Sequence, residues 1–285
     1  MIVDFRVRPP YKSFLDSWLY RPRDPNPDPV DMHPLRMDAD RCPSFLEKSM
    51  PLFMKEMDEA GIDVGVIMGR QAAPAFGSMP NEEVAELVRD YPGRFVGFGG
   101  VSGSDVPGAL EEIDRIVDFG FKGVAMDNGW SDPPLYDDDT ALFPIYEKCE
   151  RLGLILSLTS GIFIGPDLSY SNPAHIQIVA KAFPKLKINV PHGGWPWTTE
   201  MCAVAFQCRN IYLAPDFYMN IPNMPGAEQY VRATNYYLGY RLLYASSYPG
   251  RPLGQSVRQF RELDINDDIT VRACLGGNAA RLLGL

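Results

Sequence analysis

Short apolar runs alternate with amphipathic stretches along most of the chain. The apolar runs are rich in Val, Ile and Leu, which is typical of strands buried on both faces of a parallel sheet. They begin at residue 2 and recur at 64–68, 95–98, 123–126, 154–158, 187–190, 211–214 and 242–245. Between them, apolar residues recur at helical spacing over 45–60, 81–91, 109–119, 144–152, 173–183, 198–208, 226–238, 256–263 and 267–275.

The alternation predicts one large α/β domain. Each strand after the first follows a helical stretch, and most of these stretches end at Gly or Pro, for example at Gly61 and Gly153. Eight such strands predict a single-domain (β/α)₈ TIM barrel over residues 1–285. A doubly wound open sheet is the alternative, but Arg8-Pro9-Pro10 stands where that fold usually carries a glycine-rich turn.

Residues 10–43 interrupt the pattern. They are rich in proline and charge and show little periodicity. A linker would need a domain on each side, and one strand is too short to be a domain. We therefore interpret 10–43 as a lid-like loop inserted after the first strand.

Composition narrows the class of protein. An apolar fraction of 46% suits a globular chain with a substantial core, and the net charge of −9, without a basic run, argues against nucleic acid or an anionic membrane as partner. No apolar run reaches transmembrane length, and the chain starts in a strand with no signal-peptide core, so we expect a cytoplasmic protein. The sequence leaves open whether the protein forms a homo-oligomer.

Polar residues gather at the predicted strand ends. In a TIM barrel the catalytic residues lie at the carboxyl ends of the strands. Arg6 and Arg8 are spaced so that both project from one face of the first strand. The other strand ends carry Arg70, Asp127, Thr159, His192, Asp216 with Tyr218, and Ser247 with Tyr248.

Several motifs resemble the amidohydrolase superfamily. They are the end of the first strand and the runs VPHGGWP at 190–196, YASSYP at 244–249 and GGNAARLL at 276–283. More narrowly they resemble its amidohydrolase-related branch of metal-dependent hydrolases, decarboxylases and lactonases. The resemblance covers essentially the whole chain and implies the same barrel.

The metal ligands that this resemblance implies are mostly replaced. Arg6 and Arg8 stand where the family has two histidines, Thr159 stands for a third, and Ser247 stands for an aspartate, so that only His192 is kept. Arginine stays protonated and cannot bind a cation, whereas a catalytic metal needs about three protein ligands. We expect no metal cofactor; a divalent metal held by His192 with a carboxylate is the less favoured alternative.

The replacements predict an anion site. The forked guanidiniums of Arg6, Arg8 and Arg70 suit a small carboxylate. We predict His192 as general base or acid, with Asp216 or Asp127 orienting it or activating water. The remaining predicted substrate-binding residues are Thr159, Ser247, Tyr248 and Tyr218.

Two classes of function follow. The first is an enzyme, a metal-independent hydrolase of a small carboxylated substrate such as a lactone, with a lyase such as a decarboxylase as the second choice. The second is a barrel that has lost catalysis and binds a carboxylate. The retained His192 favours the enzyme, and the loss of the other metal ligands favours the binder.

Overall fold

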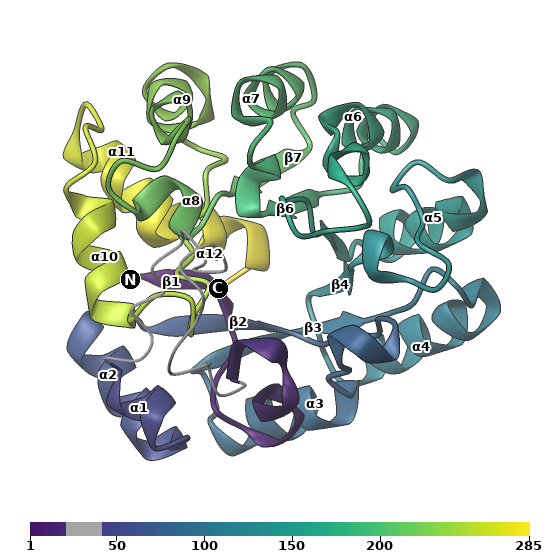
Figure 1. Ribbon diagram of the computed structural model, residues 1–285, viewed down its shortest axis with the longest axis horizontal. Coiled ribbons are helices and arrows are strands. Elements are labelled where there is room, and N and C mark those ends of the chain that lie inside the picture. The colour runs from purple at the N-terminus through teal and green to yellow at the C-terminus, as the bar shows by residue number, and fades with distance from the viewer. Residues whose placement is uncertain (21–41) are drawn as a thin grey trace, which may run out of the picture.

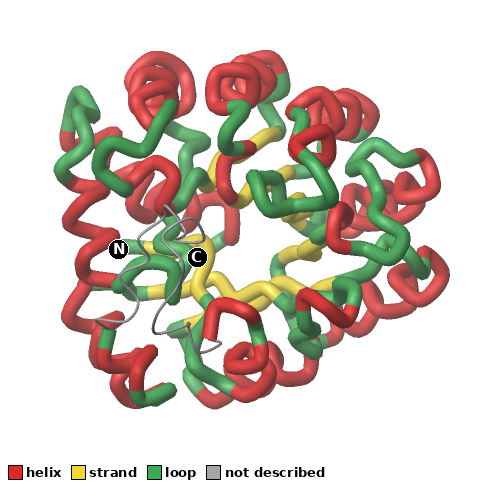
Figure 2. Tube along the Cα trace, in the orientation of Figure 1, coloured by secondary structure: helices red, strands yellow, loops and turns green. Residues whose placement is uncertain are grey.

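A computed structural model of the protein describes residues 1–20 and 42–285. Its centre is a sheet of parallel strands that pair in chain order. Figures 1 and 2 show these strands arranged in a ring, with helices around the outside. The strands are β1 Val3–Val7, β2 Val64–Met68, β3 Phe95–Gly100, β4 Gly123–Met126, β5 Ile155–Leu158, β6 Ile188–Pro191 and β7 Ile211–Ala214.

An extended segment, rather than a regular eighth strand, closes the ring. Residues 242–245 lie between β7 and β1, where Leu242 forms a parallel bridge with Leu213 and Tyr244 O accepts a hydrogen bond of 2.9 Å from Phe5 N. These isolated contacts are too few for a continuous ladder. The barrel prediction is therefore confirmed over an open sheet, but the regular strand predicted at 242–245 is wrong.

The predicted helices occur in the predicted order, but one of them is divided, and two short helices at 217–220 and 278–283 were not predicted. The helix expected over 45–60 is split, because Ser49 caps a second helix by accepting a hydrogen bond from Leu52 N. The helices are α1 Pro43–Leu46, α2 Met50–Ala60, α3 Asn81–Asp90, α4 Val106–Asp118, α5 Phe143–Leu152, α6 Pro173–Ala182, α7 Thr198–Gln207, α8 Phe217–Asn220, α9 Ala227–Ala233, α10 Leu253–Arg261, α11 Asp268–Arg272 and α12 Asn278–Leu283.

The core has two layers. One apolar cluster joins residues from strands around the whole ring, including Phe5, Val66, Phe98 and Ile155, and such residues can meet only inside the barrel. The larger cluster fills the space between the sheet and the surrounding helices. The filled interior leaves the strand ends as the place for a site.

The loop predicted over 10–43 is described only in part. Its start forms two short 3₁₀ turns, Lys12–Asp16 and Trp18–Tyr20, and residues 21–41 lie outside the described part. Among residues 1–20 and 42–285, no helix combines the length and the apolar character that a membrane span requires.

Candidate active site at the carboxyl ends of the strands

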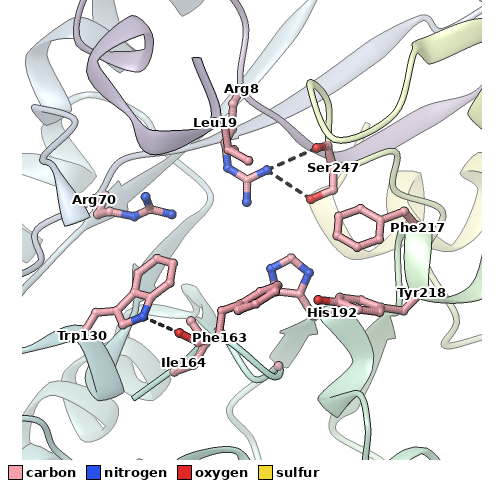
Figure 3. Close-up of a pocket in the computed structure, with 11 residues that line it drawn as sticks. Arg8, Leu19, Arg70, Trp130, Phe163, Ile164, His192, Phe217, Tyr218 and Ser247 are labelled. Atoms are coloured by element: carbon pink, nitrogen blue, oxygen red, sulfur yellow. Dashed lines mark hydrogen bonds between the residues drawn. The ribbon is translucent and has the colours of Figure 1, made fainter. Parts of the chain in front are cut away.

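Two neighbouring cavities open where the strands end. The outer cavity holds about 480 Å³ of space, its mouth included, and Figure 3 shows it between the arginines and the aromatic side chains. The inner cavity is narrower, with about 320 Å³ of space when its open mouth is included, and it reaches the strand residues Met68 and Ala125. The outer cavity is lined by Arg8, Leu19, Arg70, Trp130, Gly161, Phe163, Ile164, His192, Phe217, Tyr218 and Ser247.

Most of the predicted site residues line these cavities. Arg8 and Arg70 line both of them. The remaining predicted residues of the outer cavity are His192, Tyr218 and Ser247, and those of the inner cavity are Arg6, Asp127 and Thr159.

Tyr248 lies apart from both cavities. Its hydroxyl is 2.7 Å from Oγ of Ser44, and its ring packs against Phe53 with 4.8 Å between the centroids. Tyr248 therefore packs beside the first helices and is not among the residues that line either cavity.

Each arginine of the outer cavity is fixed by neighbouring groups. Nη1 of Arg8 donates to Oγ of Ser247 at 3.1 Å and to its carbonyl oxygen at 3.4 Å. Nε of Arg70 donates to Oδ2 of Asp127 at 2.9 Å, and the guanidinium lies 4.8 Å from the centre of the Trp130 ring. These contacts hold the cations in place before any ligand arrives, which lowers the entropy lost on binding.

The arginine cluster is incompletely neutralised. Arg6, Arg8 and Arg70 are each 7% exposed or less. Burial lowers the pKa of Arg8, and the like charges of Arg6 and Arg70 lower it further. Nη1 of Arg6 and Nη1 of Arg70 are buried without a hydrogen-bond partner among the described residues. Buried, unpaired cationic donors are costly unless an anion pairs with them, so the cluster is suited to an anionic ligand.

Asp127 is the carboxylate nearest to this cluster. Burial raises its pKa, but Arg70 and Arg6 outweigh burial, with help from the hydroxyl of Thr159, and hold the pKa below its ordinary value. Asp127 is therefore ionised near neutral pH, and its first effect is to orient Arg70 through their ion pair.

His192 and Asp216 form a close pair on another side of the outer cavity. Nδ1 of His192 lies 2.7 Å from Oδ2 of Asp216. The pair is close but not aligned as a hydrogen bond, since these atoms have no hydrogen-bond partner within the described part of the chain. Burial lowers the pKa of His192; Arg6 and Arg8 lower it further, and Asp216 offsets only part of this. His192 is consequently neutral at pH 7.

Unusual backbone conformations place these residues. His192, Asp216 and Ser247 have φ of 63°, 50° and 55°, in the left-handed region that non-glycine residues seldom adopt. Gly193 follows with φ of 60°, and a Cβ there would come within 3.0 Å of Cα of Pro215. Such conformations persist only where the surrounding structure holds them, and they are common at functional sites.

Aromatic side chains form two walls of the outer cavity, and of these only Tyr218 was predicted from the sequence. Trp130 donates from Nε1 to the carbonyl oxygen of Phe163 at 2.6 Å and stacks on Phe76 with 4.8 Å between the centroids. Phe217 and Tyr218 form the opposite wall, beside His192. Two signals were available, because Phe217 directly follows Asp216 and Trp130 follows Asp127 by three residues. An aromatic wall favours a planar ligand.

The donor set does not fit a catalytic metal. Among the described residues, no three His, Cys, Asp or Glu side chains cluster as a metal site requires. The nearby His192 and Asp216 supply two donors, while Arg6 and Arg8 supply positive charge that would repel a cation. No chemical step is therefore assigned to a metal.

Comparisons with known proteins agree with this fold. A curated relative, the 2-amino-3-carboxymuconate-6-semialdehyde decarboxylase of Dictyostelium discoideum, is 25% identical over 247 residues, which is 72% of this chain. The chain spans 65% of the length of that relative.

Two solved structures illustrate the range of similarity. A TIM-barrel protein from Bordetella bronchiseptica is 35% identical with a TM-score of 0.89, and the match covers 99% of this chain and 98% of that one. A 2,6-dihydroxybenzoate decarboxylase from Rhizobium is 18% identical with a TM-score of 0.73, and the match covers 99% and 98% of the two chains. The second likeness concerns the fold alone.

The family assignment rests on a broader match. The family model described as amidohydrolase matches residues 48–285, which is most of the chain. The barrel and the polar strand ends agree with that match. This protein belongs to the amidohydrolase family.

Proposed function

We propose that this protein is a lyase that decarboxylates a small, planar carboxylic acid. The observation that carries the proposal is the uneven charge around the outer cavity. The cations Arg8 and Arg70 stand on one side, and neutral His192 stands on another (Figure 3). The carboxylate of Asp216 is buried next to His192, with Oδ2 2.7 Å from Nδ1 of the imidazole. The curated decarboxylase relative supports the reaction class.

The charge arrangement suits the electron movement of decarboxylation. The bond from the substrate carbon to its carboxylate breaks, CO₂ leaves, and the electron pair moves into the conjugated system and onto an oxygen. A carboxylate beside Asp216 is destabilised by like charge, whereas an oxygen beside Arg8 and Arg70 is stabilised as it becomes negative. The negative charge thus moves toward the arginines as the bond breaks.

His192 can complete the reaction by moving a proton. With Nδ1 held against Asp216, Nε2 can accept a proton from water or from a substrate hydroxyl and deliver it to the carbon that lost CO₂. The balance is one carboxylate and one proton consumed, and one CO₂ and one C–H bond formed. Asp216 stabilises the imidazolium that exists between the two transfers.

Hydrolysis is the second candidate. The lowered pKa of His192 leaves its imidazole neutral, as a general base that activates water must be. Arg8 or Arg70 would then polarise the carbonyl of a carboxylated lactone. The two candidates differ in their product, since hydrolysis releases no CO₂.

A screen of carboxylated aromatics, unsaturated acids and lactones tests the proposal. The protein is first treated with a chelator, and CO₂ release and lactone opening are measured in parallel. We expect CO₂ release that is retained after chelation and lost in His192→Asn. Activity that returns only on addition of zinc or manganese would contradict a role for the arginines in place of a metal.

The same screen separates the other functions. Lactone opening without CO₂ would support the hydrolase. A rise in melting temperature with carboxylates but no consumption of any of them would support a binding barrel.

A further inference from the structure

The inner cavity has the features of a second anion site. We propose that it is a subsite for a second carboxylate of the substrate, one that is retained in the product, so that the protein acts on diacids. The inference rests on the proposed decarboxylation for the fate of the first carboxylate, and it adds the class of substrate. The evidence is the arrangement of Arg6, Arg70 and their neighbours around this cavity.

Arg70 is held at three places with one end left free. Its backbone N and O bond to Met79 O and N at 3.1 and 2.9 Å, its Nε is bound by Asp127, and its plane lies over Trp130. Gly69 permits this close packing, since a Cβ there would lie 2.8 Å from N of Gly100. Nη1 remains buried and without a hydrogen-bond partner within the described residues. A rigid, unpaired donor is what a preorganised anion site requires.

Arg6 supplies a second free donor to the same cavity. Its backbone N donates to Oδ1 of Asp4 at 3.2 Å, where the pairing of β1 with β2 shifts register. Arg6 lines the inner cavity, and its Nη1 is also buried without a hydrogen-bond partner in the part of the chain that the structure describes. Two guanidiniums with free donors can each bind one oxygen of a carboxylate.

The charges that line the inner cavity favour an anion. Three arginines, Arg6, Arg8 and Arg70, line it together with one carboxylate, that of Asp127. The lining therefore carries more positive than negative charge. The hydroxyl of Thr159 lies at the same wall and stabilises the ionised form of Asp127, which in turn orients Arg70.

One molecule can reach both cavities. Arg8 and Arg70 line the inner cavity and the outer cavity alike, so the two are adjacent. A planar diacid would place its ring against Trp130, one carboxylate toward His192 and the other toward Arg6. A monoacid would leave either the position next to His192 or the position next to Arg6 without a carboxylate.

Binding of simple aromatic acids tests the subsite without requiring turnover. Dissociation constants are measured for isophthalate, which has two carboxylates, and for benzoate, which has one. We expect isophthalate to bind the wild-type protein at least about 30-fold more tightly, because the second carboxylate gains charge-assisted hydrogen bonds. In Arg6→Gln this ratio should fall to about threefold or less.

Two further variants make the result interpretable. Thr159→Val removes an uncharged donor from the same cavity and should lower the ratio by a smaller factor, even if Arg6→Gln folds poorly. Arg115→Gln removes an exposed arginine of α4 that pairs with Glu82 and lines neither cavity, and it should leave the ratio unchanged. Circular dichroism and the melting temperature without ligand establish that each variant is folded.

The outcomes separate this inference from the proposed reaction. Equal binding of isophthalate and benzoate by the wild type, or an unchanged ratio in both Arg6→Gln and Thr159→Val, would overturn the subsite even if monoacids lose CO₂. Acetate that strengthens benzoate binding would show an independent anion in the inner cavity and overturn the diacid assignment. Arg6-dependent diacid binding with no CO₂ from any acid would support the subsite and contradict the decarboxylase.

Discussion

The arginine side and the histidine side of the outer cavity are built by different means. The arginine side consists of Arg8 and Arg70, and side-chain contacts to Ser247, Asp127 and Trp130 hold it in place. The histidine side consists of His192 and Asp216, and both residues have left-handed backbone conformations. A charge cluster acts over several ångströms, whereas a proton transfer needs atoms within hydrogen-bond reach. The need for exact placement accounts for the left-handed backbone at both residues of the histidine side, whereas on the arginine side only the contact residue Ser247 has such a conformation.

The largest effect should come from the histidine side. His192→Asn removes the imidazole but suits the left-handed backbone, which Asn tolerates better than other non-glycine residues. We expect the rate of CO₂ release to fall by about 10² to 10⁴, the usual contribution of a general acid or base. The dissociation constant of the acid should change little, because the arginines remain.

A rate within about threefold of the wild type would contradict the role of His192. The melting temperature of His192→Asn serves as the control, since an unfolded variant would lose binding and rate together. A loss of binding with the rate constant unchanged would place the chemistry on the arginine side instead.

The arginine side should give the next largest effect. Arg70→Met removes the charge and the hydrogen-bond donors while keeping part of the apolar stem over Trp130. We expect kcat/KM to fall by roughly 10- to 100-fold through the loss of one or two charge-assisted hydrogen bonds. Arg70→Lys is the matched variant, because it restores the charge but not the fork that pairs with Asp127.

The effects of Arg70→Met and Arg70→Lys on KM and on kcat distinguish two roles for Arg70. If Arg70 mainly binds the ground state, KM rises in both variants; if it stabilises developing charge, kcat falls in Arg70→Met and recovers in part in Arg70→Lys. An unchanged kcat/KM in both would remove Arg70 from the site.

The two sides should also be coupled through the pKa of His192. Burial lowers this pKa below 6.5, Arg6 lowers it further, and Asp216 raises it. The imidazole therefore stays neutral as the pH falls through 6.5 and becomes charged only at lower pH. We expect Arg6→Gln to move the titration of His192 to higher pH and Asp216→Asn to move it to lower pH.

Proton NMR can measure this directly. The chain has three histidines, so the ring resonances of His192 can be assigned by their absence in His192→Asn. A titration that moves in the same direction in both variants would contradict the electrostatic coupling. The same shift should appear in the acid limb of kcat/KM, which reports the free enzyme.

Much of the fold could be predicted from the sequence. Local hydrophobic periodicity determines the strands, and the predicted bounds 64–68, 123–126 and 211–214 agree with β2, β4 and β7. The eighth strand could not be predicted correctly, because whether an apolar run forms a ladder depends on its neighbours. Only isolated bridges and hydrogen bonds connect 242–245 to β7 and β1.

The site was predictable where side chains lie at strand ends and less so elsewhere. His192 and Arg70 could be predicted because functional residues of a TIM barrel lie at the carboxyl ends of its strands. Trp130 and Phe163 were not predicted, because a 3₁₀ turn and a loop bring them to the cavity; the only signal for Trp130 was its position three residues after Asp127. Tyr248 was predicted from its place at the last strand end, but the structure packs it against Phe53 and Ser44, away from both cavities.

The smallest effect should arise where the two sides meet, at Ser247. Its hydroxyl and carbonyl both accept from Arg8, while its φ of 55° disfavours every residue with a Cβ. Ser247→Ala removes the hydroxyl and keeps the strain; Ser247→Gly removes both. We therefore expect both variants to weaken acid binding by the same small factor, about three- to tenfold. Ser247→Gly should have the higher melting temperature of the two, because its free energy of unfolding should exceed that of Ser247→Ala by about 1 kcal/mol. Equal melting temperatures would show that the left-handed conformation is not strained, and wild-type binding in both would show that the carbonyl alone positions Arg8.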